Sequence, residues 1–253
     1  MSTYKQFKIS IICATFNAES VLENMIKSII SQKKAEIEFI IIDGNSKDST
    51  LDIIKKYYSY IDYFISESDR GIYDAWNKGI KAAKGEWVMF IGADDELLPD
   101  ALNQYLNLLN SKDLSMYDYI SAQNEFINDQ DKMLKLMGEG AEWNSIRKRM
   151  SAAHVASLHH RENFFGEVGF YNLDFKICAD YEILLRKKEK LRSYFIPTKI
   201  AKMKVGGMSF TKKAIMEAYE IRKFHNTISP LFNKFLYYRD CLAYNFFKLR
   251  KSI

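Results

Sequence analysis

The chain has 253 residues, of which 47% are hydrophobic and 27% are charged, and its formal net charge is +5. A chain of this length and composition buries the core of one globular domain and is not disordered as a whole. The small positive charge comes without a basic patch interleaved with stacking aromatics, so we expect no nucleic-acid partner.

Three cysteines, Cys13, Cys178 and Cys241, are widely separated and form no CxxC pair. Their spacing argues against a structural zinc site or a disulfide framework and favours a reducing compartment. The segment Met1–Ser10 has no apolar signal-peptide core, and no apolar window approaches the ~18 residues that span a bilayer. These observations predict a cytoplasmic protein.

The first hundred residues alternate short apolar runs with helical periods. The predicted strands are Ile9–Cys13, Glu38–Asp43, Ile61–Ser66 and Trp87–Gly92. The predicted helices cover residues 21–30, a stretch that begins near residue 48, and residues 73–83. This order of strands and helices predicts a parallel sheet with helices on both faces.

The sequence also predicts how the first helix begins and which side chains the second helix buries. Ser20 and Glu23 have the spacing of a capping box at the start of the first helix. The second helix is expected to bury Leu51, Ile54 and Tyr58 against the sheet.

The second half of the chain has a different pattern. The runs Tyr117–Phe126 and Lys132–Met137 predict an antiparallel hairpin. Helices are expected near 141–150 and 179–190, and short strands near 193–196 and 200–205.

Polar residues follow each of the first four predicted strands. In open α/β sheets, ligands bind beyond the carboxyl ends of the parallel strands, so these residues define a candidate site. They are Thr15 and Asn17, Asp43, Asp69 and Arg70, and Asp94 and Asp95.

Two of these features have a structural and a functional interpretation. Asp94 and Asp95 either form a turn before the next helix or supply the hard oxygen ligands that suit Mg²⁺ or Mn²⁺. Asp43 either shapes a turn or accepts hydrogen bonds from a nucleotide base or ribose.

Five blocks follow one another along the chain: Ile11–Asn17, Ile41–Thr50, Asp69–Gly79, Gly92–Asp95 and Ala179–Arg186. In their order and spacing over residues 8–210 they resemble the family 2 glycosyltransferases, whose catalytic domain has the nucleotide-sugar-binding GT-A fold.

The resemblance implies an α/β GT-A fold, with a mixed, mostly parallel sheet flanked by helices and a C-terminal helical appendage. It places the catalytic domain at residues 1–212, with a nucleotide-binding half at about 1–98 and an acceptor half at about 99–212. Residues 213–253 would form the helical extension.

The resemblance also implies roles for individual residues. Thr15, Asn17, Asp43, Asp69 and Arg70 would bind the nucleotide. Asp94 would face the ribose or the sugar, and Asp95 would bind the Mn²⁺ or Mg²⁺ ion that bridges the phosphates. Asp180 would be the general base.

Three positions depart from the family's pattern. Gly92 stands where the metal motif often has its first Asp, and Gly44 where a second acidic residue often follows the second strand. The usual Glu-Asp pair of the fifth block is Ala179–Asp180, which leaves Asp180 as the only candidate base in that block.

The implied reaction is an inverting transfer of a sugar to a hydroxyl. A cation that stabilises the departing diphosphate acts mainly in the transition state. A positioned carboxylate such as Asp180 contributes roughly 10²–10⁴-fold as a general base.

His154 has two interpretations, as a core histidine among small apolar residues or as a member of the donor or acceptor site. His159 and His160 are expected at the surface. Trp76 and Trp143 are expected in the core, with sugar stacking as the alternative.

The C-terminal stretch 231–251 mixes aromatic and basic residues at near-helical spacing. It either lies on an anionic membrane surface, or packs on the catalytic domain or on a second subunit as a homodimer. The first alternative suits a lipid-linked acceptor, such as an undecaprenyl-diphosphate-linked oligosaccharide of O-antigen or capsule biosynthesis. It would place the protein peripherally at the inner face of the cytoplasmic membrane.

Two other classes of function remain as alternatives. A nucleotidyltransferase also places carboxylates and a metal at parallel strand ends, but usually has a Gly-rich, basic phosphate loop after its first strand. The segment here is Ala14–Ala18, without a glycine or a basic residue. A non-catalytic relative that binds a nucleotide sugar is compatible with Gly92 and Ala179. Among donors, a UDP-sugar is favoured because Asp43 is compatible with uracil.

Overall fold

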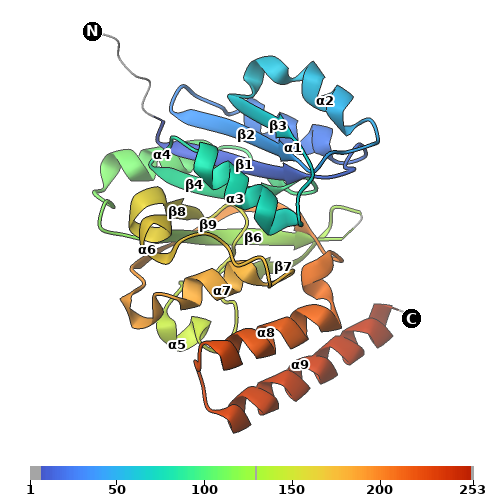
Figure 1. The fold of residues 1–253 in the computed structure, drawn as a ribbon, viewed down its shortest axis with the longest axis vertical. Coiled ribbons are helices and arrows are strands. Elements are labelled where there is room, and N and C mark those ends of the chain that lie inside the picture. Colours follow the sequence, from blue (N-terminus) through green and yellow to red (C-terminus); the bar gives the residue numbers. More distant parts are fainter. Residues whose placement is uncertain (1–6, 129, 252–253) are drawn as a thin grey trace.

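The computed structural model describes residues 7–128 and 130–251, with side chains up to residue 246. The first six residues of Met1–Ser10, the segment without a signal-peptide core, lie outside this part. The described residues form one mixed sheet with the strand order β3-β2-β1-β4-β8-β6-β9-β5, and β7 pairs with β6 (Figure 1). The strands are β1 Ile9–Thr15, β2 Ile37–Asp43, β3 Tyr63–Ser66, β4 Trp87–Gly92, β5 Glu96–Leu97, β6 Tyr119–Ile127, β7 Met133–Met137, β8 Leu158–His160 and β9 Ser193–Lys204.

The N-terminal half has the predicted parallel arrangement. Strand β1 lies between β2 and β4 and is parallel to both, and β3 extends the sheet beyond β2. The third strand begins at Tyr63 rather than at Ile61, because a short 3-10 turn at Tyr58–Tyr60 precedes it.

Helices cover both faces of the sheet because the side chains of each strand alternate between them. In β1, Ile11 and Cys13 belong to one hydrophobic core, and Ile12 and Ala14 belong to the other. The first core is covered by α1 Leu22–Ile30, α2 Thr50–Lys56 and α4 Ala101–Ser111. The second is covered by α3 Ile72–Ala82, α5 Trp143–Ile146, α6 Gly166–Val168 and α7 Ala179–Leu185 (Figure 1).

The predicted capping box of α1 is wrong. Val21 is the N-cap residue and makes no side-chain cap bond. Glu23 instead accepts hydrogen bonds from Lys56 Nζ at 2.8 Å and from Tyr57 Oη at 2.6 Å. The last residue of α2 and the tyrosine that follows it therefore hold the carboxylate that would have capped α1.

The second helix is shorter than predicted. It ends at Lys56, with Ile54 buried and Leu51 half-buried. Tyr58 lies in the 3-10 turn and is 59% exposed, so it does not contribute to the core as expected. Its ring contacts Phe64 edge-on at 6.4 Å.

The predicted hairpin is confirmed as β6 and β7. The two short strands expected at 193–205 are one strand, β9, which pairs in parallel with β6. The pairing shifts register between Ser121 and Asn124, opposite the exposed Pro197, which has no N–H to donate. The helices expected near 141–150 and 179–190 are likewise shortened to α5 and to α7, which is followed by a 3-10 turn at Lys188–Lys190.

His159 and His160 are buried, not exposed as expected. They end β8, which lies inside the sheet between β4 and β6. His159 has no exposed surface, and its ring lies 4.7 Å from that of Tyr119 and 5.4 Å from that of Phe90. Their position in an interior strand follows from strand pairing that the local sequence does not encode.

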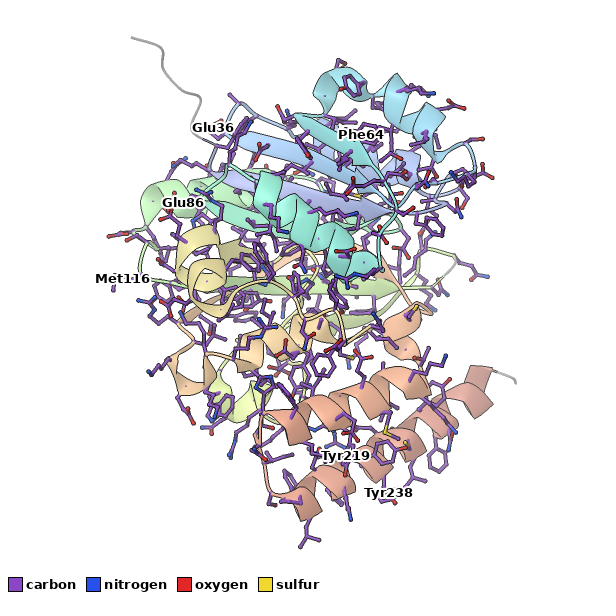
Figure 2. All side chains as sticks on the ribbon, in the orientation of Figure 1. Glu36, Phe64, Glu86, Met116, Tyr219 and Tyr238 are labelled. Carbon is purple, nitrogen blue, oxygen red and sulfur yellow. The ribbon has the colours of Figure 1, made fainter. Side chains whose placement is uncertain are left out.

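Two long helices, α8 Lys212–Phe224 and α9 Pro230–Lys251, complete the chain. Figure 1 shows them side by side at the end of the molecule opposite α2, with α8 next to α7. Arg222 Nε donates to Asn233 Oδ1 at 2.7 Å, and the rings of Tyr219 and Tyr237 lie 5.4 Å apart. Figure 2 shows Tyr238 on α9, the outer helix of the pair. The division of the chain at residue 212 remains a prediction.

Two further expectations concern the chain as a whole. Cys13, Cys178 and Cys241 are free thiols. Within residues 7–128 and 130–251, no helix combines the length and the apolar character needed to cross a membrane.

Candidate active site

The strand register brings the predicted site residues to one edge of the sheet. Thr15 is opposite Asp43, Asp43 is opposite Ser66, and Ala14 is opposite Gly92. Because these strands are parallel, the loops that follow them leave from the same edge. The candidate site is therefore built from the loops after β1, β2, β3 and β4.

Asp43 is fully buried, and its carboxylate organises the loop that follows β2. It accepts hydrogen bonds from the Ser46 backbone N–H at 3.0 Å, from the Ser46 hydroxyl, and from the Ser66 hydroxyl at 2.6 Å. These bonds satisfy a carboxylate that would otherwise be costly to bury. The structural interpretation of Asp43 is thus realised, and its contact with a nucleotide stays a prediction.

Asn17 joins the loops after β1 and β2. Its backbone N–H donates to Ser46 Oγ at 2.9 Å, and its Oδ1 accepts from the Lys47 N–H at 2.9 Å. Thr15 lies at the end of β1, where its buried hydroxyl has no hydrogen-bond partner among the residues that the structure describes.

The glycine at position 44 makes room for Asp69. A Cβ placed on Gly44 would lie 2.8 Å from Asp69 Oδ2 and 3.2 Å from Phe16. Asp69 is held there because its other oxygen accepts from the Gly71 N–H at 2.8 Å. The carboxylate of Asp69 therefore occupies space that an acidic side chain at position 44 would need.

The glycine at position 92 has the same relation to the acidic pair. A Cβ there would lie 2.8 Å from Asp95 Oδ2 and 2.9 Å from Asp94 Oδ1. Asp95 accepts from the Gly92 N–H at 3.1 Å and is buried, whereas Asp94 is exposed. Burial and the neighbouring charge of Asp94 raise the pKa of Asp95 to about 7.

Arg70 is the least constrained of the predicted nucleotide-binding residues. Its side chain is 73% exposed, with Nε 3.8 Å from Asp74 Oδ2. Its backbone N–H donates to the same carboxylate at 3.0 Å, so Asp74 fixes the loop before α3 while the guanidinium stays in solvent.

Asp180 lies in the first turn of α7, half-buried against α3. Tyr73 Oη lies 3.1 Å from Asp180 Oδ1 and 2.6 Å from the Ile177 carbonyl oxygen. Burial and the charge of Asp180 raise the pKa of Tyr73, so the phenol stays protonated and remains a donor. Tyr73 thus links the candidate base to helix α3 of the N-terminal half.

His154 is buried beneath α3, in the core of aromatic side chains. Its ring is stacked on Phe90 at 5.4 Å and lies 4.9 Å from Trp76, and its Nε2 is 3.5 Å from Tyr171 Oη. Burial lowers the pKa of His154, and the negative charge of Asp180 opposes this shift. Its membership of the site stays a prediction.

The residues that hold these carboxylates were not predicted from the sequence. Ser46 and Ser66 bind Asp43, and Tyr73 binds Asp180. Tyr73 lies within the third family block, but its contact joins residues more than a hundred positions apart. No local pattern predicts such a contact.

The donor set fits a divalent metal ion only in part. Across the described stretches 7–128 and 130–251, no group of three or more His, Cys, Asp or Glu residues has the geometry of a metal site. Asp94 and Asp95 supply hard carboxylate oxygens beside Gly92, in space that a side chain at position 92 would fill. A cation there would take its remaining ligands from water and substrate phosphates, as Mg²⁺ usually does.

Comparison with known proteins agrees with this architecture. The family model described as Glycosyl transferase family 2 matches residues 10–220. A PGL/p-HBAD biosynthesis glycosyltransferase of Mycobacterium bovis (strain BCG / Pasteur 1173P2) is 30% identical over 184 residues, which are 70% of this chain and 68% of the relative.

Solved structures show the same fold at low identity. The structure of S. aureus TarS 1–349 in complex with UDP-GlcNAc has a TM-score of 0.70 and 15% identity, covering 91% of this chain and 70% of that one. The mannosyltransferase PcManGT from Pyrobaculum calidifontis, in complex with GDP-Man and Mn²⁺, has a TM-score of 0.60 and 15% identity, covering 88% of this chain. The chain spans 64% of the PcManGT chain, and 64% of TarS 1–349 in another structure.

The mixed sheet with its polar edge therefore has the GT-A fold expected from the sequence. The chain belongs to the family 2 glycosyltransferases.

Proposed function

We propose that the protein is a metal-dependent, inverting glycosyltransferase that moves a sugar from a nucleoside-diphosphate donor to an acceptor hydroxyl. The acceptor is a glycan or a lipid-linked oligosaccharide of surface polysaccharide biosynthesis, of the O-antigen or capsule type. The observation that carries this proposal is the pair of carboxylate sites, Asp94–Asp95 beyond β4 and Asp180 at the start of α7. Family membership supports the reaction class.

A UDP-sugar is the donor that we favour. The TarS structures include complexes with UDP and with UDP-GlcNAc, whereas PcManGT is bound to GDP-Man and Mn²⁺. The loops that Asp43 and Asn17 organise present backbone groups at the edge where a nucleotide would bind. Asp43 would lie near the base, and Asp69, whose Oδ2 is beside Gly44, would be a neighbouring contact.

The reaction assigns different tasks to the two carboxylate sites. Asp95, with Asp94, would hold Mn²⁺ or Mg²⁺, which stabilises the charge on the departing diphosphate when bound. Asp180 would accept the proton of the acceptor hydroxyl as that oxygen attacks the anomeric carbon. The Tyr73 hydroxyl, which the Ile177 carbonyl oxygen and Asp180 Oδ1 share as a donor, would help to orient Asp180.

Calorimetric titration with UDP, dTDP and GDP, with and without Mn²⁺, tests the donor site. We expect one nucleotide to bind in a metal-dependent way and the Asp95→Asn variant to lose that dependence. Asp52→Asn, at an exposed carboxylate on α2, is the matched control and should bind as the wild type does. Asp180→Asn should keep nucleotide affinity and lose transfer by about 10²-fold or more.

The outcomes separate the rival functions. Failure of the folded protein to bind any of the three nucleotides would contradict the proposed donor site and the assignment of residues to it. Nucleotide binding without transfer to any acceptor would favour the non-catalytic relative. Pyrophosphate release from a nucleoside triphosphate would identify a nucleotidyltransferase.

We also propose that α9 contacts an anionic membrane surface. Its exposed side carries five large apolar residues at intervals of three or four, which places them on one helical face. They are Leu231, Phe235, Tyr238, Leu242 and Phe246, each between 59% and 82% exposed. Such a face, bordered by cations, fits the boundary between lipid headgroups and acyl chains. Vesicle flotation tests this location.

A further inference from the structure

The short helix that carries Asp180 is held from two sides. Helix α7 has seven residues, Ala179–Leu185, and Asp180 lies in its first turn. A helix of this length is marginal by itself, and its first turn has backbone N–H groups without intrahelical partners. The position of Asp180 therefore depends on contacts that other elements make with both ends of α7.

Helix α8 provides a contact at the N-terminal end. Glu217 Oε1 accepts hydrogen bonds from the Ile177 N–H at 2.8 Å and from the Cys178 N–H at 2.9 Å. Cys178 is the N-cap residue of α7, and its thiol lies 3.6 Å from the Ala214 carbonyl oxygen of α8. A carboxylate on α8 thus satisfies the N–H groups that lead into the turn with Asp180.

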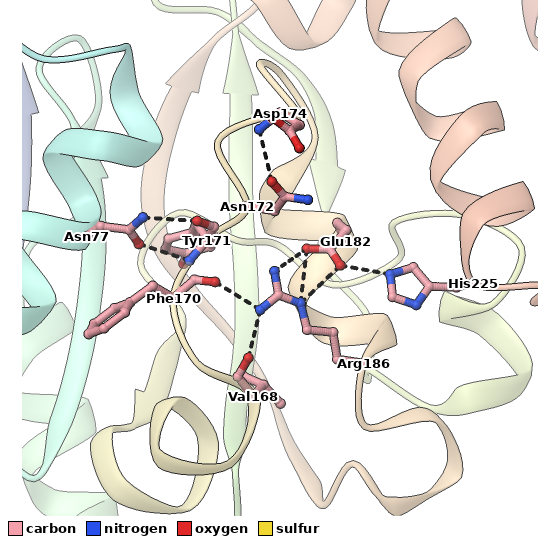
Figure 3. Close-up of polar contacts among 9 residues, drawn as sticks. All are labelled: Asn77, Val168, Phe170, Tyr171, Asn172, Asp174, Glu182, Arg186 and His225. Atoms are coloured by element: carbon pink, nitrogen blue, oxygen red, sulfur yellow. Dashed lines mark hydrogen bonds and ion pairs between the residues drawn. The ribbon is translucent and has the colours of Figure 1, made fainter.

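His225, the residue directly after α8, provides a second contact farther along α7. His225 Nε2 lies 2.8 Å from Glu182 Oε1, and Arg186 Nε donates to the same carboxylate at 3.0 Å and 3.1 Å (Figure 3). Burial would raise the pKa of Glu182, but the bonds from His225 and Arg186 outweigh it and hold the pKa below its usual range. Glu182 is therefore an ionised anchor two positions after Asp180.

The opposite side of the same segment is fixed to α3. Arg186 Nη1 donates to the carbonyl oxygens of Val168 and Phe170 at 2.7 Å and 2.9 Å. Asn77 of α3 donates from Nδ2 to the Tyr171 carbonyl oxygen at 3.0 Å, and its Oδ1 accepts from the Tyr171 N–H at 2.9 Å (Figure 3). The segment that leads to Asp180 is thus connected to the nucleotide-binding half through a continuous chain of hydrogen bonds.

We propose that α8 is a positioning element for Asp180, and that Glu217 is its principal positioning residue, with His225 as the second. This inference rests on the proposed role of Asp180 as the general base. Glu217 does not touch the reacting atoms; it sets the start of α7 so that Asp180 meets the acceptor hydroxyl. The helical extension is then part of the catalytic unit and not only a surface for docking.

The size of the expected effect follows from the geometry of proton transfer. A displacement of about 1 Å in a reacting group costs on the order of 10²-fold in rate. Loss of the two hydrogen bonds to Glu217 should therefore lower kcat. Nucleotide binding at the loops after the parallel strands should be unchanged.

The test compares three substitutions on α8 in the full chain. Glu217→Ala removes the acceptor, and we expect kcat to fall about 10–100-fold, with KM for the donor and UDP affinity within about twofold of wild type. Glu217→Gln keeps Oε1, the atom that accepts both bonds, and should restore most of kcat. Glu220→Ala is the matched control, because Glu220 is exposed and pairs with Lys223 on the same helix.

Amide hydrogen exchange gives a readout that is independent of catalysis. The Ile177 and Cys178 amides should exchange faster in Glu217→Ala than in the wild type, and the strand amides of β1 should not. His225→Leu removes the second anchor and provides the same kinetic test if Glu217→Ala does not fold.

Two outcomes would overturn the inference, and they are distinguishable. If Asp180→Asn is inactive while Glu217→Ala and His225→Leu keep the wild-type kcat, α8 does not position the base. If Asp180→Asn retains full transfer, the base assignment itself is wrong, and the positioning role of Glu217 falls with it.

Discussion

At the scale of single residues, the packing of Asp95 against Gly92 and Asp94 determines its charge state. Gly92 lets the oxygens of Asp94 and Asp95 approach the same backbone position, where a Cβ would be within 2.9 Å of both. Burial and the charge of Asp94 then raise the pKa of Asp95 to about 7. The departure from the usual Asp at position 92 is thus a steric consequence of how this acidic pair is packed.

The raised pKa predicts that metal binding depends on pH near neutrality. A cation needs the ionised carboxylate, so protonation of Asp95 competes with binding as the pH falls below about 7. We expect the apparent affinity for Mn²⁺ with a UDP-sugar to fall about tenfold between pH 8 and pH 6. A UDP-sugar is the suitable probe because its diphosphate does not titrate in this range.

Calorimetry at the two pH values, on wild type and Asp95→Asn, provides the measurement. The variant should bind weakly at both values and lose the pH dependence. An equal Mn²⁺ affinity of the wild type at pH 6 and pH 8 would show that Asp95 is not the titrating ligand.

At the scale of elements, a buried ion cluster fixes how β9 joins the sheet. Asp118, just before β6, accepts from Lys187 Nζ at 2.8 Å and from the backbone N–H and Nη2 of Arg192 at 2.8 Å and 2.9 Å. Arg192 immediately precedes β9, so the cluster sets the starting register Tyr119–Ser193 of the parallel pair. Burial opposes ionisation of Asp118, but the two cations hold its pKa below the usual range.

Removing this carboxylate should destabilise the fold. Asp118→Asn removes the buried counter-charge of Lys187, which keeps its contacts with the exposed carboxylate of Glu167 and with the Asn163 carbonyl oxygen. We expect a loss of about 3 kcal/mol in the free energy of unfolding. Because the folded-state pKa is lowered, this stabilisation is present at neutral pH and is lost as the pH falls through that pKa, below about 4.

Urea denaturation at pH 7 and at low pH measures both effects. Glu167→Gln is the matched control, since its carboxylate is 61% exposed and should be worth less than about 1 kcal/mol. Equal losses from the two substitutions would contradict a structural role specific to Asp118.

At the scale of the whole molecule, the loops after β1–β4 that form the candidate site and the outer side of the C-terminal helices lie on different parts of the surface. Helix α8 turns towards α7, and α9 lies outside it (Figure 1). Asn233 and Leu236 of α9 are buried against the rest of the protein, whereas the side with Phe235 and Leu242 is open to solvent. Exposed Lys234 and Arg239 follow the apolar face on its two sides, an arrangement that favours an anionic lipid surface.

This arrangement predicts binding to vesicles that contain phosphatidylglycerol. We expect the full chain to float with such vesicles at low salt, and the double substitution Phe235→Ser with Leu242→Ser to reduce the bound fraction at least about tenfold. Met116→Ser removes an equally exposed apolar side chain, 65% accessible, far from α9 and should have no effect. Flotation of the double variant at the wild-type level would contradict the membrane location.

Most of the N-terminal half was predictable from local pattern. Strand β4 has the predicted bounds and β2 begins one residue early, because buried parallel strands give continuous apolar runs. The edge position of Asp43 and Asp95 follows from those runs. The contacts of Asp180 with Tyr73, and of α7 with Glu217, were not predictable, since they join residues that are far apart in the chain.

The sequence by itself determined the family, the parallel half of the sheet and the identity of the carboxylates at its edge. These features depend on side-chain period and on short blocks, which are local properties. Only the tertiary structure decided that β9 is one strand, that His159 is buried, and that α8 and the residue after it contact the start and the middle of the helix with Asp180. Strand pairing and helix packing bring distant residues together through burial and hydrogen bonding, and no local pattern in the chain specifies those partners.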